Sequence, residues 1–368
     1  MKYKLKDIFD LQMGKTPARN NRNYWNTKEN KWISIADLSK TGKYISTTKE
    51  YLSDAAVEES GIKVIPANTV VMSFKLSIGK TAITTEEMYS NEAIMAFHDR
   101  RVVDILPEYV FYMFKYRNWE EGSNKAVMGK TLNKATLSDV EIEICPIEKQ
   151  REIVAVLDKL MAVLEHREDE LQLLDKLIKA RFVEMFGDPR SNPFSFDEWM
   201  LKDTCKVITG NTPSRAVSEY YGNYVEWIKT DNIVSGLLNP TKATECLSEK
   251  GMEAGRIVER DSILMACIAG SIASIGRVCV TDRTVAFNQQ INAVVPEKYN
   301  VLFLYVLLQI SKDYLVEDVN MALKGILSKS KLEEKKFIVP PIELQNQFAD
   351  FVNQVNKSKV EVQKAPQL

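Results

Sequence analysis

Histidine is scarce in this sequence and cysteine is not patterned, which excludes several classes of reactive site. Among 368 residues there are two histidines, His98 and His166, and neither has a set of metal-ligating neighbours in the sequence. The five cysteines include no C-x-x-C pair and mostly stand within apolar runs, so we expect buried, reduced thiols rather than a zinc cage. The sequence therefore predicts no metal site and no catalytic residue in this chain.

Long apolar runs and the signatures of nucleotide-dependent enzymes are missing as well. The longest apolar run, residues 301–308, is far shorter than the roughly 18 residues that a membrane span needs. No signal-peptide pattern opens the sequence, and we therefore expect a cytoplasmic protein. There is no N-P-P-[FY] or D-P-P-[FY] tetrapeptide, no P-loop, no glycine-rich loop for S-adenosylmethionine and no H-E-x-x-H helix. These absences argue against a methyltransferase or nuclease that acts unaided.

The overall composition is ordinary for a globular protein. Hydrophobic residues make up 45% of the chain and charged residues 27%, and the formal net charge is -1. A near-neutral total neither requires nor forbids a nucleic-acid partner, because binding depends on where the charges cluster. The length exceeds what one hydrophobic core usually supports, so two domains are expected.

The chain contains most of its motifs twice, in the same order, about 195 positions apart. Four motifs carry this repeat: G-K-T-P (14–17) and G-N-T-P (210–213), W-I (32–33 and 227–228), S-I-G-K (77–80) and S-I-G-R (274–277), and P-I-E-K-Q (146–150) and P-I-E-L-Q (341–345). Solenoid repeats have periods of only about 20 to 50 residues. The repeat therefore indicates two whole homologous domains in tandem.

Each copy combines short β-rich runs with a few helical segments. Strands in the first copy are expected at residues 32–35, 69–74, 94–97 and 140–144. Residues 107–116 and their counterpart 299–310 have the apolar spacing of a helix. The sequence therefore predicts an α+β fold in which each of two tandem domains contains a largely antiparallel sheet.

A long helix is expected between the two copies, at residues 146–187. Pro146 suits the first turn of a helix, and Gly187 followed by Pro189 supplies a stop. A second, shorter helix at 341–368 also carries an apolar stripe, so the two helices are expected to pack as an antiparallel coiled coil. The stripe expected to bind a partner on the first helix consists of Leu157, Leu160, Leu164, Leu171, Leu174 and Ile178.

The duplicated motifs resemble those of the specificity subunits of type I restriction-modification systems. The resemblance covers nearly the whole chain and includes the F-G-D-P sequence at the end of the long helix. It implies two target-recognition domains, residues 1–145 and 188–340. It also implies a conserved spacer helix at 146–187 and a short distal helix at 341–368.

The same resemblance implies a function. Each domain is expected to read one half of a split double-stranded DNA target, while the helices set the spacing and dock two methyltransferase subunits. A restriction subunit completes such complexes, and S-adenosylmethionine is expected on the methyltransferase, with no cofactor in this chain. Alternatives are a modification-only or type IIB-like system, an enzyme that acts on DNA by itself, and a scaffold that never touches DNA.

The basic segment from Lys15 to Lys31 is the first candidate for DNA contact. Arginine and asparagine read guanine and adenine edges, and lysine neutralises phosphates. We expect contacts from Lys15, Thr16, Arg19 and Arg22, and the alternative is a solvated surface loop. The equivalent loop of the second copy is less basic, and its candidates are Asn211, Thr212, Ser214 and Arg215, together with Lys229.

Two further clusters place cations beside small residues. In the S-I-G turns, a glycine lets backbone N–H groups approach a phosphate, and the alternative is an ordinary hairpin glycine. The candidates there are Lys75, Ser77 and Lys80 in the first copy and Ser271 and Arg277 in the second. The other cluster is expected to clamp the DNA backbone with Lys130, Asn133, Lys134, Lys324, Ser328 and Lys329.

Of two neighbouring positions, the first holds the same residue in both copies and the second does not. Asn91 and Asn288 occur in both copies and are expected to form turns, and the alternative is that they read an adenine. Glu92 stands where the second copy has Gln289. This difference indicates that the two domains read different half-site sequences.

Overall fold

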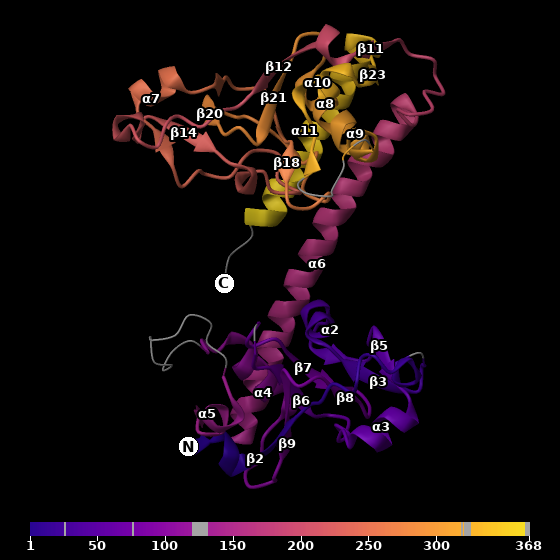
Figure 1. The fold of residues 1–368 in the computed structure, drawn as a ribbon, viewed down its shortest axis with the longest axis vertical. Coiled ribbons are helices and arrows are strands. Elements are labelled where there is room, and N and C mark those ends of the chain that lie inside the picture. Colours follow the sequence, from indigo (N-terminus) through magenta and orange to yellow (C-terminus); the bar gives the residue numbers. More distant parts are fainter. Residues whose placement is uncertain (26, 76, 120–131, 318, 320–324, 365–368) are drawn as a thin grey trace. The chain divides into compact units, whose positions relative to one another are not determined.

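The computed structural model of the protein describes residues 1–25, 27–75, 77–119, 132–317, 319 and 325–364. The chain forms two compact units, Met1–Leu164 and Glu165–Leu368. The boundary between them falls inside α6 (Ile147–Phe186), which Figure 1 shows as one continuous helix. Each unit therefore includes the part of α6 that packs on it.

In the first unit, the two ends of the β-rich segment pair with one another. β1 (Lys2–Lys4) runs antiparallel to β10 (Glu141–Glu143), shortly before α6 begins. The main sheet has the order β2-β9-β6-β7-β4, and a smaller sheet has the order β5-β3-β8. Most neighbours are antiparallel, as predicted, although β3 is parallel to β8 and β4 is parallel to β7. These strands are β2 (Phe9–Met13), β3 (Asn30–Ile33), β4 (Tyr44–Ile45), β5 (Glu50–Leu52), β6 (Val70–Ser73), β7 (Thr81–Thr84), β8 (Tyr89–Ser90) and β9 (Ile94–Asp99).

Helix α4 (Pro107–Tyr116) closes the core of the first unit. It begins with a proline, whose missing N–H costs no helical hydrogen bond in the first turn. It lies against β6 and β7 (Figure 1), where Phe111 and Phe114 are buried. The strand predicted at 32–35 ends at Ile33, because Ser34 caps the next helix instead. The other helices are α1 (Leu5–Ile8), η1 (Arg22–Tyr24), α2 (Ile35–Lys40), α3 (Asp54–Ser60) and α5 (Lys134–Ser138).

The second unit repeats this arrangement. β11 (Glu198–Met200) pairs antiparallel with β23 (Lys336–Ile338), shortly before α11 (Ile342–Lys364). The main sheet has the order β12-β21-β17-β19, and a second sheet, β13-β15-β14-β20-β16, contains the parallel pair β14 and β20. The strands are β12 (Cys205–Thr209), β13 (Tyr221–Gly222), β14 (Val225–Ile228), β15 (Cys246–Leu247), β16 (Ile257–Val258), β17 (Ile263–Ala266), β18 (Ile268–Ala269), β19 (Val278–Val280), β20 (Val285–Phe287), β21 (Ile291–Pro296) and β22 (Gly325–Ile326).

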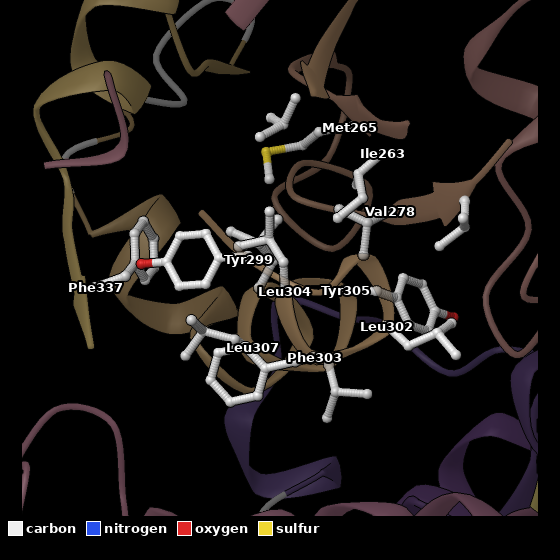
Figure 2. Close-up of a cluster of buried hydrophobic side chains, with 14 of the residues drawn as sticks. Ile263, Met265, Val278, Tyr299, Leu302, Phe303, Leu304, Tyr305, Leu307 and Phe337 are labelled. Atoms are coloured by element: carbon white, nitrogen blue, oxygen red, sulfur yellow. The ribbon is translucent and has the colours of Figure 1, made fainter. Parts of the chain in front are cut away.

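Helix α8 (Val301–Ile310) is the centre of the second core. It is apolar on all sides, and residues 302–308 are buried, as expected for a helix covered on every face. Figure 2 shows Phe303 and Leu304 in a cluster that also contains Met265 of β17. The other helices are η2 (Leu201–Asp203), η3 (Ser218–Tyr220), η4 (Thr230–Asn232), α7 (Glu249–Ala254), α9 (Lys312–Val316) and α10 (Lys329–Glu334).

In the second unit, α11 packs antiparallel against the C-terminal part of α6. Phe348, near the start of α11, contacts Phe182 and Phe186, with ring centroids 5.5 and 5.6 Å apart. Further along α11, Lys359 pairs with Asp175 of α6. The residue numbers run in opposite directions, so the antiparallel helix pair predicted from the sequence is present over this stretch. No helix of the described residues has both the length and the apolar character needed to cross a membrane.

Candidate nucleic-acid interface

The G-x-T-P motifs form loops that lie directly against the backbone of a neighbouring turn. Gly14 N–H donates to Ile94 O and Lys15 N–H to Ser90 O, at 3.1 and 2.8 Å. Gly210 N–H donates in the same way to Ile291 O at 3.0 Å. A Cβ atom at Gly14 would lie 2.2 Å from a backbone oxygen, and one at Gly210 would lie 2.1 Å from one. Both loops therefore require glycine for close approach of two backbone segments.

The tryptophans of the W-I motifs hold these loops from the other side. Trp32 Nε1 donates to Lys15 O at 3.0 Å, and Trp227 Nε1 donates to Asn211 O at 3.3 Å. Both indole rings are buried. The G-x-T-P and W-I motifs thus form one structural feature in each unit, the recognition loop, which comprises residues 14–25 in the first unit and 210–221 in the second.

An arginine–glutamate pair, stacked on aromatic rings, holds the middle of the first recognition loop. The Arg19 guanidinium binds both carboxylate oxygens of Glu50, at 2.5 and 3.2 Å. It also lies 3.8 Å from the ring centroid of Trp25 and 4.7 Å from that of Trp32. Bidentate geometry and stacking both favour arginine over lysine at this place.

The second unit contains the same arrangement. Arg215 binds both oxygens of Glu245, at 3.3 and 2.9 Å, and stacks on Tyr221 and Trp227 with centroid distances of 4.5 and 5.2 Å. Lys229 also pairs with Glu245 at 2.6 Å. Hydrogen bonds from Arg215 and Lys229 lower the pKa of Glu245 to about 2. We call these two arrangements the arginine clasps.

The clasps were not predicted as a unit from the sequence, although Arg19 and Arg215 were singled out. Glu50 and Glu245, the partners, were missed. A signal was present, because Glu50 follows Trp32 by the same interval as Glu245 follows Trp227. The fold places both glutamates against the arginines of the loops.

The threonine of each G-x-T-P motif anchors the side chain that differs between the copies. Thr16 donates its hydroxyl hydrogen bond to Glu92, and Thr212 donates to Gln289. The bond from Thr16 lowers the pKa of Glu92, and the nearby charges of Lys75 and Arg19 act in the same direction. In the second unit, Arg277 donates to Thr230 O at 3.3 Å. The fold thus brings Lys75 near Glu92.

The S-I-G turns use their glycines as hairpin residues. Gly79 and Gly276 have φ values of 89° and 76°, which favour glycine. Their N–H groups donate to Ser73 O and Ala266 O, at 2.9 and 2.8 Å. These N–H groups are thus engaged within the hairpins, which agrees with the alternative interpretation of this glycine and not with phosphate binding by its N–H. The neighbouring Lys80 and Ser77 are exposed, Arg277 is half-buried, and Ser271 is exposed with its hydroxyl 3.0 Å from that of Ser274.

The third predicted cluster contains two helix caps. The Asn133 side chain accepts a hydrogen bond from Thr136 N at the start of α5, and Ser328 accepts one from Lys331 N at the start of α10. Both side chains have the geometry of N-caps. Lys134 is exposed, and Lys329 lies 3.5 Å from Glu333. Lys130 and Lys324 lie outside the described residues.

The remaining predicted contacts are spread over the loops. Lys15 Nζ donates to Ser60 O, and Asn211 donates to Ala254 O at 2.9 Å. Arg22 and Ser214 are exposed. Asn91 and Asn288 form the predicted turns, because each Oδ1 accepts from the backbone N–H two residues later.

The apolar stripe predicted on α6 is divided between two roles. Leu157 packs on the core of the first unit, and Leu174 and Ile178 pack on that of the second. Leu160 and Leu171 are half-buried, and Leu164 is 48% exposed. Three of the six residues therefore contribute to the cores of their own units. Other exposed apolar side chains on α6 include Val156, Val163, Leu173 and Leu177.

Three of the five cysteines are buried. Burial raises the pKa of Cys205, Cys267 and Cys279 to about 12, so their thiols stay protonated at neutral pH. Cys145 and Cys246 are half-buried rather than buried, which corrects the expectation for these two. In the part of the chain that the structure describes, no three His, Cys, Asp or Glu residues come together as metal ligands.

Comparison with known proteins agrees with this duplicated architecture. The specificity subunit of the type I restriction enzyme MjaIX from Methanocaldococcus jannaschii is 24% identical over 396 residues, covering 98% of this chain and 88% of that protein. The HindI specificity subunit from Haemophilus influenzae is 29% identical over 175 residues, covering 42% of this chain and 37% of that protein.

Solved structures share the fold over almost the full chain. The type I restriction-modification S subunit from M. genitalium has a TM-score of 0.54 at 15% identity, and the match covers 99% of this chain and 91% of that one. A chain from a type I R-M system has a TM-score of 0.55 at 17% identity, covering 99% and 92%. The family model of the type I restriction modification DNA specificity domain matches residues 1–174 and again residues 195–367. The chain therefore belongs to the type I restriction-modification DNA specificity family, with two copies of the family's domain.

Proposed function

We propose that each unit reads one half of a split DNA target through its recognition loop. The observation that carries this proposal is the repetition of one loop geometry, with its glycine contact, tryptophan hydrogen bond and arginine clasp, in both units. Around this common frame, the exposed side chains differ. A shared frame with different exposed groups is what two reading sites for two sequences require.

Within this proposal, the chain supplies recognition and leaves the chemistry to partners. Methyltransferase subunits would dock on α6 and α11, bind S-adenosylmethionine and methylate the target, and a restriction subunit would join the same complex. In the first unit, the exposed apolar side chains Val156 and Val163 of α6 offer a docking surface, and in the second unit Leu173 and Leu177 of α6 offer another. The length of α6 would set the number of base pairs between the two half-sites.

Mapping the methylated bases in DNA from cells that express this chain with its methyltransferase tests the proposal. The expected result is a single target with two specified halves and an unspecified gap. The Arg22→Ala variant should relax preference in one half only, because Arg22 is exposed on the first recognition loop. A continuous target, or methylation by the purified chain alone, contradicts the proposal.

The spacing role has its own test. Insertion of four residues, about one helical turn, after Glu168 lengthens α6 in an exposed stretch. The expected result is a changed gap between unchanged half-sites. Insertion of the same four residues in the exposed turn at Gly42 serves as the control, and an unchanged gap in the α6 variant rejects the spacing role.

A further inference from the structure

Glu92 and Gln289 occupy equivalent places in the two units but differ in hydrogen-bonding chemistry. Each follows the asparagine of a turn, and each accepts a hydrogen bond from the threonine of the G-x-T-P motif. We propose that each of these two residues reads one base pair of its half-site in the major groove. Glu92 accepts a hydrogen bond from the amine of cytosine, and Gln289 pairs with the donor and acceptor edge of adenine. This inference rests on the proposed function and deepens it.

The chemistry of the two side chains supports this difference. An ionised carboxylate only accepts hydrogen bonds, whereas an amide both donates and accepts. In the major groove, cytosine presents an amine donor, adenine a donor beside an acceptor, and guanine two acceptors. Glu92 is therefore matched to cytosine and repelled by guanine, and Gln289 is matched to adenine.

The surroundings of Glu92 keep it in the accepting form. The hydrogen bond from Thr16 and the charges of Lys75 and Arg19 lower its pKa, so the group is ionised at neutral pH. A carboxylate on a DNA-facing surface is repelled by phosphates unless cations lie nearby. Lys75, whose charge lowers the pKa of Glu92, also offsets that repulsion, whereas Arg19 is already paired with Glu50.

Both side chains are positioned before any DNA arrives. The hydrogen bond from Thr212 occupies one lone pair of Gln289 Oε1. The second lone pair of Oε1 and both Nε2 hydrogens are left, so the amide can still accept and donate. Glu92 likewise accepts from Thr16 through Oε2 and retains Oε1. Both residues are exposed. The two units therefore present a carboxylate and an amide at equivalent positions. This difference allows two loops of the same structure to read two sequences.

The test is the methylated target of the complete complex formed by this chain and its methyltransferase, with Glu92→Gln and Gln289→Glu compared with wild type. Glu92→Gln keeps the shape of the side chain and its ability to accept from Thr16. It should change one base pair of the first half-site from cytosine towards adenine, with discrimination shifted by about tenfold or more. Gln289→Glu should change one base pair of the other half-site. Glu87→Gln removes the same charge from an exposed position nearby and should leave the target unchanged.

A second variant separates reading from loop support. Thr16→Val releases Glu92 without altering its chemistry, so it should weaken discrimination at that base pair while cytosine stays preferred. A Glu92→Gln target identical to the wild-type target overturns the inference. A uniform loss of methylation at all sites, with thermal melting unchanged, also overturns it, because Glu92 would then only support the loop. A wild-type complex without a split target overturns the proposed function itself.

Discussion

Between Lys15 and Lys31 the first unit has five basic residues, whereas the equivalent segment of the second unit, residues 211–224, has one, Arg215. The contacts that hold the two loops are nevertheless the same: a buried tryptophan, a glycine against a backbone carbonyl, and an arginine bound to a glutamate. The two loops thus keep the same contacts although their numbers of basic residues differ. Residues shared by the two units maintain the loop, and the residues that differ are, in the proposed function, the ones that contact the target.

The comparison also changes the interpretation of individual arginines. Arg19 was expected to contact bases, but its guanidinium is engaged by Glu50 and by two indole rings. Arg22, three residues later, is exposed. We therefore expect Arg19 to support the loop and Arg22 to contact DNA.

The largest expected effect comes from Gly14→Ala and Gly210→Ala. Each adds a Cβ atom within about 2 Å of backbone oxygens, which neither backbone segment can avoid without moving. Each should cost about 3 kcal/mol of stability in its own unit. Thermal melting and hydrogen exchange of residues 14–25 and 210–221 measure this. Gly42→Ala and Gly270→Ala, where nothing lies within 4 Å, are the matched controls. Unequal losses in the two units would break the equivalence of the loops.

A smaller effect is expected from the buried glutamines of the P-I-E-x-Q motifs. Gln150 accepts from Leu106 N and donates to Cys145 O, and Gln345 accepts from Asn300 N and donates to Pro340 O. Leucine at either position leaves these buried groups unpaired, at a cost of about 2 kcal/mol. Chemical denaturation of Gln150→Leu and Gln345→Leu measures the loss, and Gln347→Leu, close to Gln345 and exposed, should be nearly neutral. Retained stability in either glutamine variant shows that water replaces the lost partners there.

The arginine clasps should contribute less, because they are partly exposed. The side chains of Arg19 and Glu50 are 49% and 36% exposed, and those of Arg215 and Glu245 are 55% and 36% exposed. Alanine at Arg19 should cost about 1 kcal/mol through the ion pair and ring stacking, and alanine at Arg215 should destabilise the second loop through the same two contacts. A double-mutant cycle of Arg19→Ala with Glu50→Ala measures the coupling energy of the pair. A coupling energy of zero would mean that the ion pair does not stabilise the loop.

The smallest effect is a pH dependence in the second clasp. The pKa of Glu245 is about 2 in the folded protein, below its ordinary value of 4.5. Its contribution to stability is therefore complete above about pH 4.5 and is lost as the pH falls towards 2. Glu245→Gln should be less stable than wild type at neutral pH, and the difference should shrink over this window. Melting curves from pH 7 to about 2 test this, with Glu253→Gln, at an exposed position of α7, as the control. A constant difference would mean that Glu245 stabilises the loop without its charge.

Much of the fold follows from local sequence signals. Pro146 and Gly187 bracket α6, which runs over Ile147–Phe186, and Gly187 has the positive φ of 73° expected of a helix stop. The apolar run at residues 301–308 becomes the buried helix α8. Local signals did not predict the caps of two short helices. Ser34 follows a β-rich run yet caps α2, and Asn133 lies in a cationic cluster yet caps α5.

The sequence alone established the duplication, the helix between the copies and the family, because these depend on the order and spacing of motifs along the chain. Only the tertiary structure decided which polar groups are already paired. Arg19 meets Glu50, and Thr16 meets Glu92, across intervals of 31 and 76 residues. The availability of a charged group for DNA depends on its surroundings in space. Those surroundings are set by the packing of loops and strands that lie far apart in the sequence. Residue type and spacing therefore predict which loops are candidates for DNA contact, and the folded contacts determine which polar side chains of those loops are already paired within the protein.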